Sequence, residues 1–318
     1  MLARVAENIY WLSRYFERAE STVRLINAHS NLLMDLPAID DHDGWMPLIS
    51  INGQDDEFLK KYGSANEHNV NHFLVLDKSN PGSLFNAFLA IQGNLRSCRD
   101  VVPKNVYEDI NSLCRRVFDV SESTVTTPSS RHEFLKGVEG RLQAIANGLN
   151  CNMYHDLGYL IMRMACYLER ADMTSRIIDV QSTRLTASNT PRELMAIEGQ
   201  RWVSVLRTLS ANQMYRQHVK RPVNGPDTLA FLLSNTRLPR SYTFCLQHLA
   251  SSVKALQRSD AIVAAIDTQL KKLNSACFKT LSQDPAGLHE FLDELQVGML
   301  GVNAEIYKTY FPPLQDSE

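Results

Sequence analysis

The apolar residues of this chain recur with the period of an α-helix. Near the N-terminus they lie three, four or seven positions apart, which places them on one helical face: Val5, Ile9, Leu12, Phe16, Ala19, Val23, Ile26 and Leu33. No Asn-Gly or Asp-Gly turn lies between alternating apolar and polar segments, as a β-hairpin would require. The pattern therefore predicts an all-α fold, a multi-helix bundle without significant β structure.

The segments between these periodic stretches carry signals typical of helix ends. Side chains that can cap a helix N-terminus stand at Ser83 and Ser241, and Asp284-Pro285 puts proline at the first position of a helix. Hydroxyl residues followed three positions later by Glu form capping boxes at Ser64, Ser130 and Thr190. We expect long helices near 4–34, 83–102, 104–119, 131–152, 155–184, 191–211, 241–257, 260–282 and 285–311. Shorter ones are expected near 45–51, 55–62, 67–76 and 226–234.

Two distant stretches of the chain have closely similar sequences. Tyr15–Ile26 aligns with Tyr167–Ile178 at an offset of 152 residues, with seven of twelve positions identical. Trp45 and Trp202 follow at an offset of 157. Collinear matches of this kind indicate a tandem duplication. We therefore expect one domain over residues 1–318, built from halves of about 1–152 and 153–318 around a pseudo-two-fold axis. The two Glu-Arg helices are expected at its centre.

Both copies of the repeat place a charged strip beside the apolar helical face. The strip contains Glu17, Glu20 and Arg24 in the first copy and Glu169, Asp172 and Arg176 in the second. Glu20–Arg24 and Asp172–Arg176 are i,i+4 pairs of the favourable orientation. On the same helical projection Arg18 and Arg170 point away from the core, where they can meet other helices.

Two interpretations of the charged strip stay open. The first is a set of ion pairs that joins neighbouring helices at the edge of the core. The second is a polar pocket between the halves, in which arginines bind an anionic or zwitterionic group. If the chain is an enzyme, Glu17 and Glu169 are the acid–base candidates, and Arg24 and Arg176 would hold an anionic substrate.

Composition excludes several classes of protein. The chain has 318 residues, of which 44% are hydrophobic and 21% charged, as in a globular protein with a full core. A formal net charge of −2 gives no overall field that attracts nucleic acid or anionic lipid, and we expect neither partner. The exception is a local basic stretch for which a solvated loop rim is the favoured interpretation: Arg216, His218, Lys220, Arg221, Arg237 and Arg240.

The chain shows no sequence feature of a membrane-spanning or secreted protein. Its most apolar stretch, residues 159–168, is far shorter than the roughly 20 residues that span a bilayer. Six scattered cysteines without paired spacing are typical of core residues in a reducing compartment. We therefore expect a cytoplasmic protein.

Recognisable catalytic and metal-binding motifs are absent from the sequence. There is no phosphate-binding glycine loop, no nucleophile elbow, and no Glu-x-x-His or His-Glu-x-x-His spacing. The acidic run Asp40–Asp43 is expected to be solvated. The sequence therefore predicts no metal and no cofactor.

The N-terminal string Met1–Glu20 resembles the opening of the alpha-E family, helical bacterial proteins named for a Glu-Arg motif. The resemblance continues through Asn80–Ser83, Tyr167–Asp172, Leu238–Ser241 and the final Tyr310-Phe311. It adds five candidate binding residues: Ser83, Asn94, Arg96, Arg240 and Ser241. This chain has Gln92-Gly93 where the family usually has a charged pair, so the role of that pair does not carry over.

The resemblance implies association with an ATP-grasp-type amide ligase and a transglutaminase-like protein, fused or as neighbours. Together with the missing catalytic motifs, it leads us to expect a non-catalytic helical accessory protein that binds the ligase, or its anionic small-molecule or peptide substrate. Two alternatives stay open. One is an enzyme in its own right that uses the Glu-Arg strip, and the other is a structural module that forms a homodimer.

Overall fold

In the computed structural model, the described residues are 3–35, 41–51, 53–182 and 191–312, and they contain sixteen helices and no β-strand. The first eight helices are α1 (Ala3–Asp35), α2 (Asp41–Ser50), α3 (Asp55–Tyr62), α4 (Glu67–Val75), α5 (Leu84–Ser97), α6 (Lys104–Phe118), α7 (Glu122–Thr126) and α8 (Pro128–Asn152). The other eight are α9 (Leu157–Ser182), α10 (Pro191–Thr208), α11 (Asn212–His218), α12 (Gly225–Leu233), α13 (Tyr242–Lys254), α14 (Asp260–Asn274), α15 (Phe278–Leu281) and α16 (Pro285–Tyr310). The all-α prediction is confirmed.

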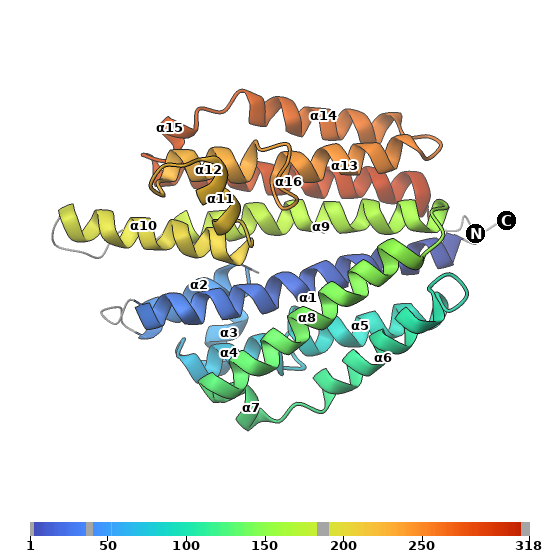
Figure 1. Ribbon diagram of the computed structural model, residues 1–318, viewed down its shortest axis with the longest axis horizontal. Coiled ribbons are helices and arrows are strands. Elements are labelled where there is room, and N and C mark those ends of the chain that lie inside the picture. Colours follow the sequence, from blue (N-terminus) through green and yellow to red (C-terminus); the bar gives the residue numbers. More distant parts are fainter. Residues whose placement is uncertain (1–2, 36–40, 52, 183–190, 313–318) are drawn as a thin grey trace.

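Helices α1 and α9 lie side by side in the middle of the molecule (Figure 1). Helices α5 and α6 lie on one side of this pair, α8 runs obliquely across α1, and α13, α14 and α16 lie on the other side. Helix α1 packs mainly against α9 and α5, whereas α9 packs mainly against α1, α13 and α16. The two Glu-Arg helices are therefore central, as the sequence predicts, and each is covered by neighbours on several sides.

One continuous apolar core joins residues from both ends of the chain. Aromatic rings occupy its most enclosed positions, among them Tyr10, Phe88 and Tyr242. Trp45 and Trp202, which the sequence repeat aligns, are both buried. Burial of this kind stabilises the bundle through the apolar area removed from water. The tandem duplication itself stays a prediction.

The expected caps at Ser83 and Ser241 are formed, and Asp284 also caps its helix. The side chains of Ser83, Ser241 and Asp284 each accept a hydrogen bond from a backbone amide three residues later, at 3.2, 3.1 and 3.0 Å. These bonds satisfy amides that have no partner within the helix. The predicted caps of α5 and α13 are confirmed, and α16 begins at Pro285 as predicted.

Two expected capping boxes are wrong. Helix α4 begins at Glu67 and is capped by Asn66, so Ser64 lies outside the helix. Helix α8 begins at Pro128, where proline suits the first turn, so Ser130 lies inside it. In both cases another residue, nearer the observed start of the helix, occupies the N-cap position. Thr190 lies outside the described residues.

The other differences concern short helices. The expected helix 260–282 is two helices, α14 and α15, because the backbone amide and hydroxyl of Ser275 bond the last carbonyls of α14 and end it. Helices α7 and α11 were not expected. They have five and seven residues, which is too few for a 3.6-residue period to be recognised.

Candidate functional site

Helices α1 and α9 run in the same direction, with equivalent residues nearly level. The Ser13 hydroxyl donates to the Met162 carbonyl at 2.8 Å, and these residues are 149 positions apart in the sequence. The contacts further along the two helices join residues 151 and 153 positions apart, and so constant a spacing requires parallel helices. Arg170 Nη2 lies 2.7 Å from Glu17 Oε2, and Arg18 Nε lies 2.6 Å from Glu169 Oε1. The Glu of each motif therefore pairs with the Arg of the other.

The expected direction of the two motif arginines is wrong. Arg18 and Arg170 do not point away from the interior but into the contact between α1 and α9, where their side chains are 32% and 18% exposed. A helical projection assigns one buried face, whereas α1 and α9 have helices on several faces. The alternative that these arginines meet another helix is confirmed.

Glu169 is completely enclosed, with a side-chain exposure of 0%. Arg14 Nε and Arg18 Nε each donate to its carboxylate at 2.6 Å. Arg14 also donates to Asn303 on α16 at 2.7 Å, and Asn303 accepts from the hydroxyl of Tyr10 at 2.6 Å. Burial alone would raise the pKa of Glu169, but the two guanidinium groups outweigh it and hold that pKa below its ordinary value.

Glu17 sits in a second cluster, on the side of α1 that faces α8. It accepts two hydrogen bonds from Arg170, at 2.9 and 2.7 Å, and a third from Arg240 at 2.8 Å. The Cys166 thiol, whose pKa burial raises to about 12, donates to the same carboxylate at 3.4 Å. Burial would raise the pKa of Glu17, but Arg170 and Arg240 hold it well below its usual range. Glu17 therefore stays ionised at neutral pH.

Glu20 and Arg24 extend the Glu17 cluster along α1. Their expected i,i+4 pair is formed, with Arg24 Nη2 2.6 Å from Glu20 Oε1. Arg240 reaches the same oxygen at 2.9 Å and so bridges Glu17 and Glu20. Arg24 also lies 3.4 Å from Glu139 on α8 and bonds the hydroxyl of Ser210, whose φ of 53° is in the left-handed region. Arg240, a candidate from the family resemblance, belongs to the site.

The corresponding pair in the second motif is different in character. Arg176 Nε lies 2.9 Å from Asp172 Oδ2, as expected. The other oxygen of Asp172 is buried and accepts no hydrogen bond from the described residues. Burial is the main cause that raises the pKa of Asp172 above its ordinary value. The charged strip is therefore not equivalent in its two copies.

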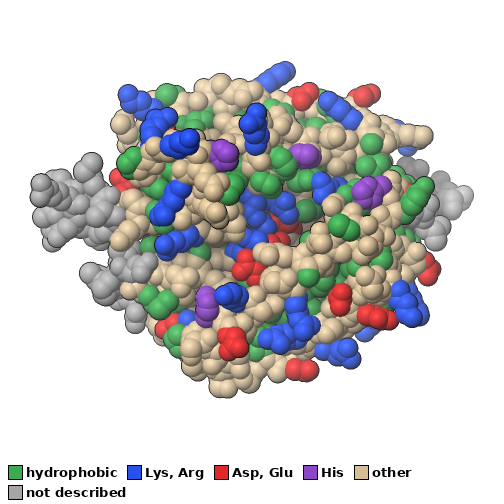
Figure 2. Space-filling view, viewed as in Figure 1, with side chains coloured by type: hydrophobic (Ala, Val, Ile, Leu, Met, Phe, Trp, Pro, Cys, Tyr) green, Lys and Arg blue, Asp and Glu red, His purple; other side chains and the backbone are tan. Residues whose placement is uncertain are grey.

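A pocket opens beside the Glu17 cluster, between α1, α8 and α9. The molecular surface is hollowed near its centre, with basic and acidic side chains at the bottom (Figure 2). The empty volume is about 840 Å³, including its opening to solvent. Most of the wall is apolar, including Leu12, Phe16, Ile145, Leu149 and Met162. Such a mixture of apolar wall and few polar groups is typical of small-molecule sites.

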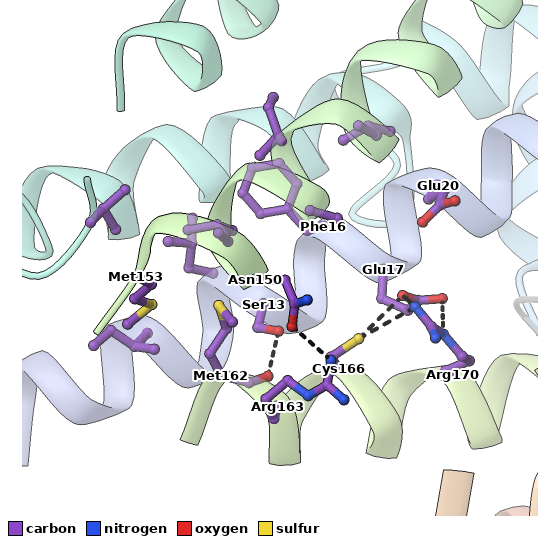
Figure 3. Close-up of a pocket in the computed structure, with 17 residues that line it drawn as sticks. Ser13, Phe16, Glu17, Glu20, Asn150, Met153, Met162, Arg163, Cys166 and Arg170 are labelled. Carbon is purple, nitrogen blue, oxygen red and sulfur yellow. Dashed lines mark hydrogen bonds and ion pairs between the residues drawn. The ribbon is translucent and has the colours of Figure 1, made fainter. Parts of the chain in front are cut away.

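The polar groups of the pocket are unevenly placed (Figure 3). Met153 lies toward one end, and Glu17, Glu20 and Arg170 lie toward the other. Arg163 lies between these ends with its guanidinium 4.7 Å from the ring centre of Tyr167. The pocket therefore combines an apolar compartment with a charged end.

Some residues of the site were not predicted from the sequence. Arg14 precedes Arg18 by four positions, so an i,i+4 spacing was the available signal. Arg163 lies seven positions before Arg170, which was a candidate, so the spacing puts both on one face of α9. Glu139 and Asn303 come from other helices, and their place at the site depends on tertiary packing alone.

The remaining candidates lie elsewhere or serve another role. Ser83 and Ser241 use their hydroxyls as helix caps. On α5, Asn94 bonds the Ala90 carbonyl of its own helix, and Arg96 is exposed. Neither contributes to the ion pairs or lines the pocket.

Metal-binding clusters and membrane-spanning helices are both missing from the described part of the chain. Those residues contain no group of three or more His, Cys, Asp or Glu side chains that could hold a metal ion. The side chains of residues 40–43 lie outside the described residues. Of the helices described, none is both long enough and apolar enough to cross a membrane.

The fold and the site define an all-helical protein centred on two parallel helices with reciprocal Glu-Arg pairs. A family model described as Alpha-E, a predicted alpha-helical domain with a conserved ER motif, matches residues 1–311. The chain therefore belongs to the Alpha-E family, and that family prediction is confirmed.

Relatives in mycobacteria are considerably longer than this chain. Uncharacterised proteins of Mycobacterium bovis and of two Mycobacterium tuberculosis strains are each 21% identical over 322 aligned positions. The match covers 93% of this chain and 35% of each relative, so the chain spans about a third of their length. No solved structure matches the chain significantly.

Proposed function

We propose that this Alpha-E protein is a helical binding partner of an ATP-grasp-type amide ligase, and that its pocket between α1, α8 and α9 holds a substrate of that ligase. The observation that carries the proposal is the state of the two motif carboxylates. Glu169 and Glu17 are each held by two arginines. The Glu169 carboxylate is enclosed, whereas Glu17 lies at the wall of an apolar pocket. This arrangement suits a rigid binding site.

Proton transfer is a poor role for these carboxylates. A general acid or base works best when its pKa lies near the pH at which it operates. The arginines lower the pKa of both Glu17 and Glu169, which moves them away from neutral pH. Hydrogen bonds from Arg170, Arg240 and the Cys166 thiol also occupy both oxygens of Glu17. We therefore favour binding over catalysis.

The ligase partner rests on the family resemblance and is compatible with the length of the relatives. Each mycobacterial relative has about two thirds of its length outside the region that matches this chain. That is enough sequence for a fused enzyme domain, since domains usually have about 50–250 residues. Where an Alpha-E protein is not fused to such an enzyme, an ATP-grasp-type ligase on a separate chain would be its partner.

The test is co-expression of this chain with an ATP-grasp-type ligase and a transglutaminase-like protein from the same organism. We expect the ligase to co-purify and the rate of amide formation to rise when the chain is present. Ala146→Trp, which places a large ring in the pocket, should remove that rise without preventing co-purification. Ala144→Trp on the same helix, outside the pocket, is the matched control.

Two outcomes would count against the proposal. One is an isolated monomer with neither enzyme bound, and the other is a ligase whose rate is the same with and without the chain.

A second candidate function, an enzyme in its own right, is supported by the position of Glu17 at the pocket wall. It predicts turnover by the chain alone that Glu17→Gln abolishes and the exposed control Glu108→Gln preserves. Glu169 is no longer a candidate for this role, since its carboxylate is enclosed and does not line the pocket.

A further inference from the structure

Arg163 is a half-buried arginine at the pocket wall that is held in place without an acidic partner. Its guanidinium lies 4.7 and 5.9 Å from the ring centres of Tyr167 and Tyr159. It contacts the side-chain oxygen of Asn150 at 3.4 Å and the hydroxyl of Tyr167. Among the described residues no carboxylate lies within ion-pair distance of it, whereas Arg170 is paired with Glu17. An arginine fixed in this way is a receptor for a carboxylate of a ligand.

Glu20 offers the opposite charge at the charged end of the pocket. Its Oε1 accepts both hydrogen bonds from Arg24 and lies 2.9 Å from Nη2 of Arg240. The other oxygen, Oε2, accepts no hydrogen bond from the described residues, and Glu20 lines the pocket. A carboxylate oxygen with unused lone pairs is a suitable acceptor for an ammonium group. The pocket thus offers an acceptor for a cation and a donor for an anion.

The separation of the two groups selects the length of a ligand. The hydrogen bond from Ser13 to the Met162 carbonyl places Arg163 nearly level with Ser13 on α1. Glu20 is seven residues further along α1, which corresponds to about 10 Å at 1.5 Å per residue. Two extended residues span roughly 7 Å, and a hydrogen bond of about 3 Å is added at each end. Two residues therefore reach at most about 13 Å in all, whereas one residue reaches about 9.5 Å, so a dipeptide with both termini free spans the distance without being fully extended.

The apolar wall of the pocket determines which side chains are accepted. Leu12, Phe16, Ile145, Leu149 and Met162 form an apolar surface next to the charged end. Apolar side chains gain free energy by leaving water for such a surface, and charged side chains do not. The wall therefore favours aliphatic or aromatic residues in the bound molecule.

We propose that the pocket binds short apolar peptides with free ends, with the carboxylate on Arg163 and the ammonium on Glu20. This assignment rests on the proposed function, because it names the class of substrate that the pocket presents to the ligase. Glu20 is already partly neutralised by Arg24 and Arg240, and Arg163 has no such partner. The carboxylate end consequently contributes more to the affinity than the ammonium end.

The test is isothermal titration of the full chain with L-leucyl-L-leucine, its C-terminal amide and its N-acetyl derivative. We expect the free dipeptide to bind, amidation to weaken binding roughly tenfold to hundredfold, and acetylation to weaken it by less. Arg163→Gln should abolish the difference between acid and amide. Glu20→Gln should abolish the difference between free and acetylated amine. Arg141→Gln, an exposed change on α8 outside the pocket, should alter neither.

Several results would overturn this inference. They are no binding of the free dipeptide at millimolar concentration, equal binding of all three molecules, or discrimination that survives in Arg163→Gln. Because the three molecules are compared on the unaltered protein, the inference stays testable if Glu20→Gln does not fold. If the dipeptide fails to bind while the ligase still co-purifies, the peptide assignment is wrong and the proposed partnership stands.

Discussion

Glu17 and Glu169 occupy equivalent positions in the two Glu-Arg helices, yet Glu17 lines the pocket between α1, α8 and α9 and Glu169 does not. Each carboxylate faces two arginines, and in each case one of them comes from the opposite motif. The difference arises from the helices that cover them. Helix α16 contributes Asn303 to the Glu169 cluster, whereas the pocket between α1, α8 and α9 opens beside Glu17. The same motif can therefore join two helices at one place and form the wall of a pocket at another.

The largest effect is expected for Glu169→Gln. This change removes the charged carboxylate that both Arg14 and Arg18 contact. Their two guanidinium charges then lose this acidic partner inside the bundle. Breaking a buried pair in this way costs about 3–5 kcal/mol of the free energy of unfolding, measured by urea denaturation. Glu108→Gln on the exposed face of α6 is the control, with an expected change below about 0.5 kcal/mol.

A smaller loss is expected for Glu17→Gln. Arg240 keeps its contact with Glu20 in this variant, and water from the pocket can reach Arg170. We expect a loss of roughly 1–3 kcal/mol in the same urea experiment, the cost of one charge-assisted interaction. A loss equal to or greater than that of Glu169→Gln would remove the distinction between an ion pair that joins helices and a pocket wall.

The pH dependence of stability should report both carboxylates. Their pKa values in the folded protein lie below the ordinary 4.5, so their stabilisation is complete above pH 4.5 and is lost as the pH falls below it. The unaltered protein should therefore lose stability more steeply below pH 4.5 than the double variant Glu17→Gln with Glu169→Gln. Some slope should remain in both proteins, because hydrogen bonds from Lys61 and Ser79 outweigh burial and lower the pKa of Asp77 to about 2. Equal slopes would contradict the expectation.

The smallest effect is expected for Asp172→Asn. Burial raises the pKa of Asp172, so its charge destabilises the folded protein at neutral pH and this cost is relieved as the pH falls through that pKa. The substitution removes this cost together with the pair to Arg176, whose side chain is 27% exposed. We expect a net change below about 1 kcal/mol in unfolding free energy at pH 7. A loss as large as that of Glu169→Gln would show that Asp172 also joins helices through a buried ion pair.

The sequence predicts those features of the fold that depend on neighbouring positions. The helical period, the caps at Ser83 and Ser241 and the pairs Glu20–Arg24 and Asp172–Arg176 all involve residues within one or two turns. The boxes at Ser64 and Ser130 failed although they are local, because each sequence contains a competing residue nearer the helix start.

The site depends on contacts that no local pattern contains. Arg18 and Arg170 were placed on an outer face, but α1 and α9 have no single outer face. The approach of Arg240 to Glu17 joins residues 223 positions apart. The pocket likewise requires α8 to lie across α1 and α9 at a particular distance, and its walls are ordinary core residues by composition.

Arg240 links the pocket to the start of α13. Its backbone carbonyl accepts a hydrogen bond from Thr174 on α9 at 2.9 Å, while its side chain bridges Glu17 and Glu20 on α1. The turn that carries it is therefore anchored to both central helices at once. A ligand that draws Glu20 toward itself would weaken the contact between Glu20 and Arg240. The turn before α13 would then change position at the protein surface when the pocket is filled. A partner protein that binds this turn could distinguish the filled pocket from the empty one without contacting the ligand.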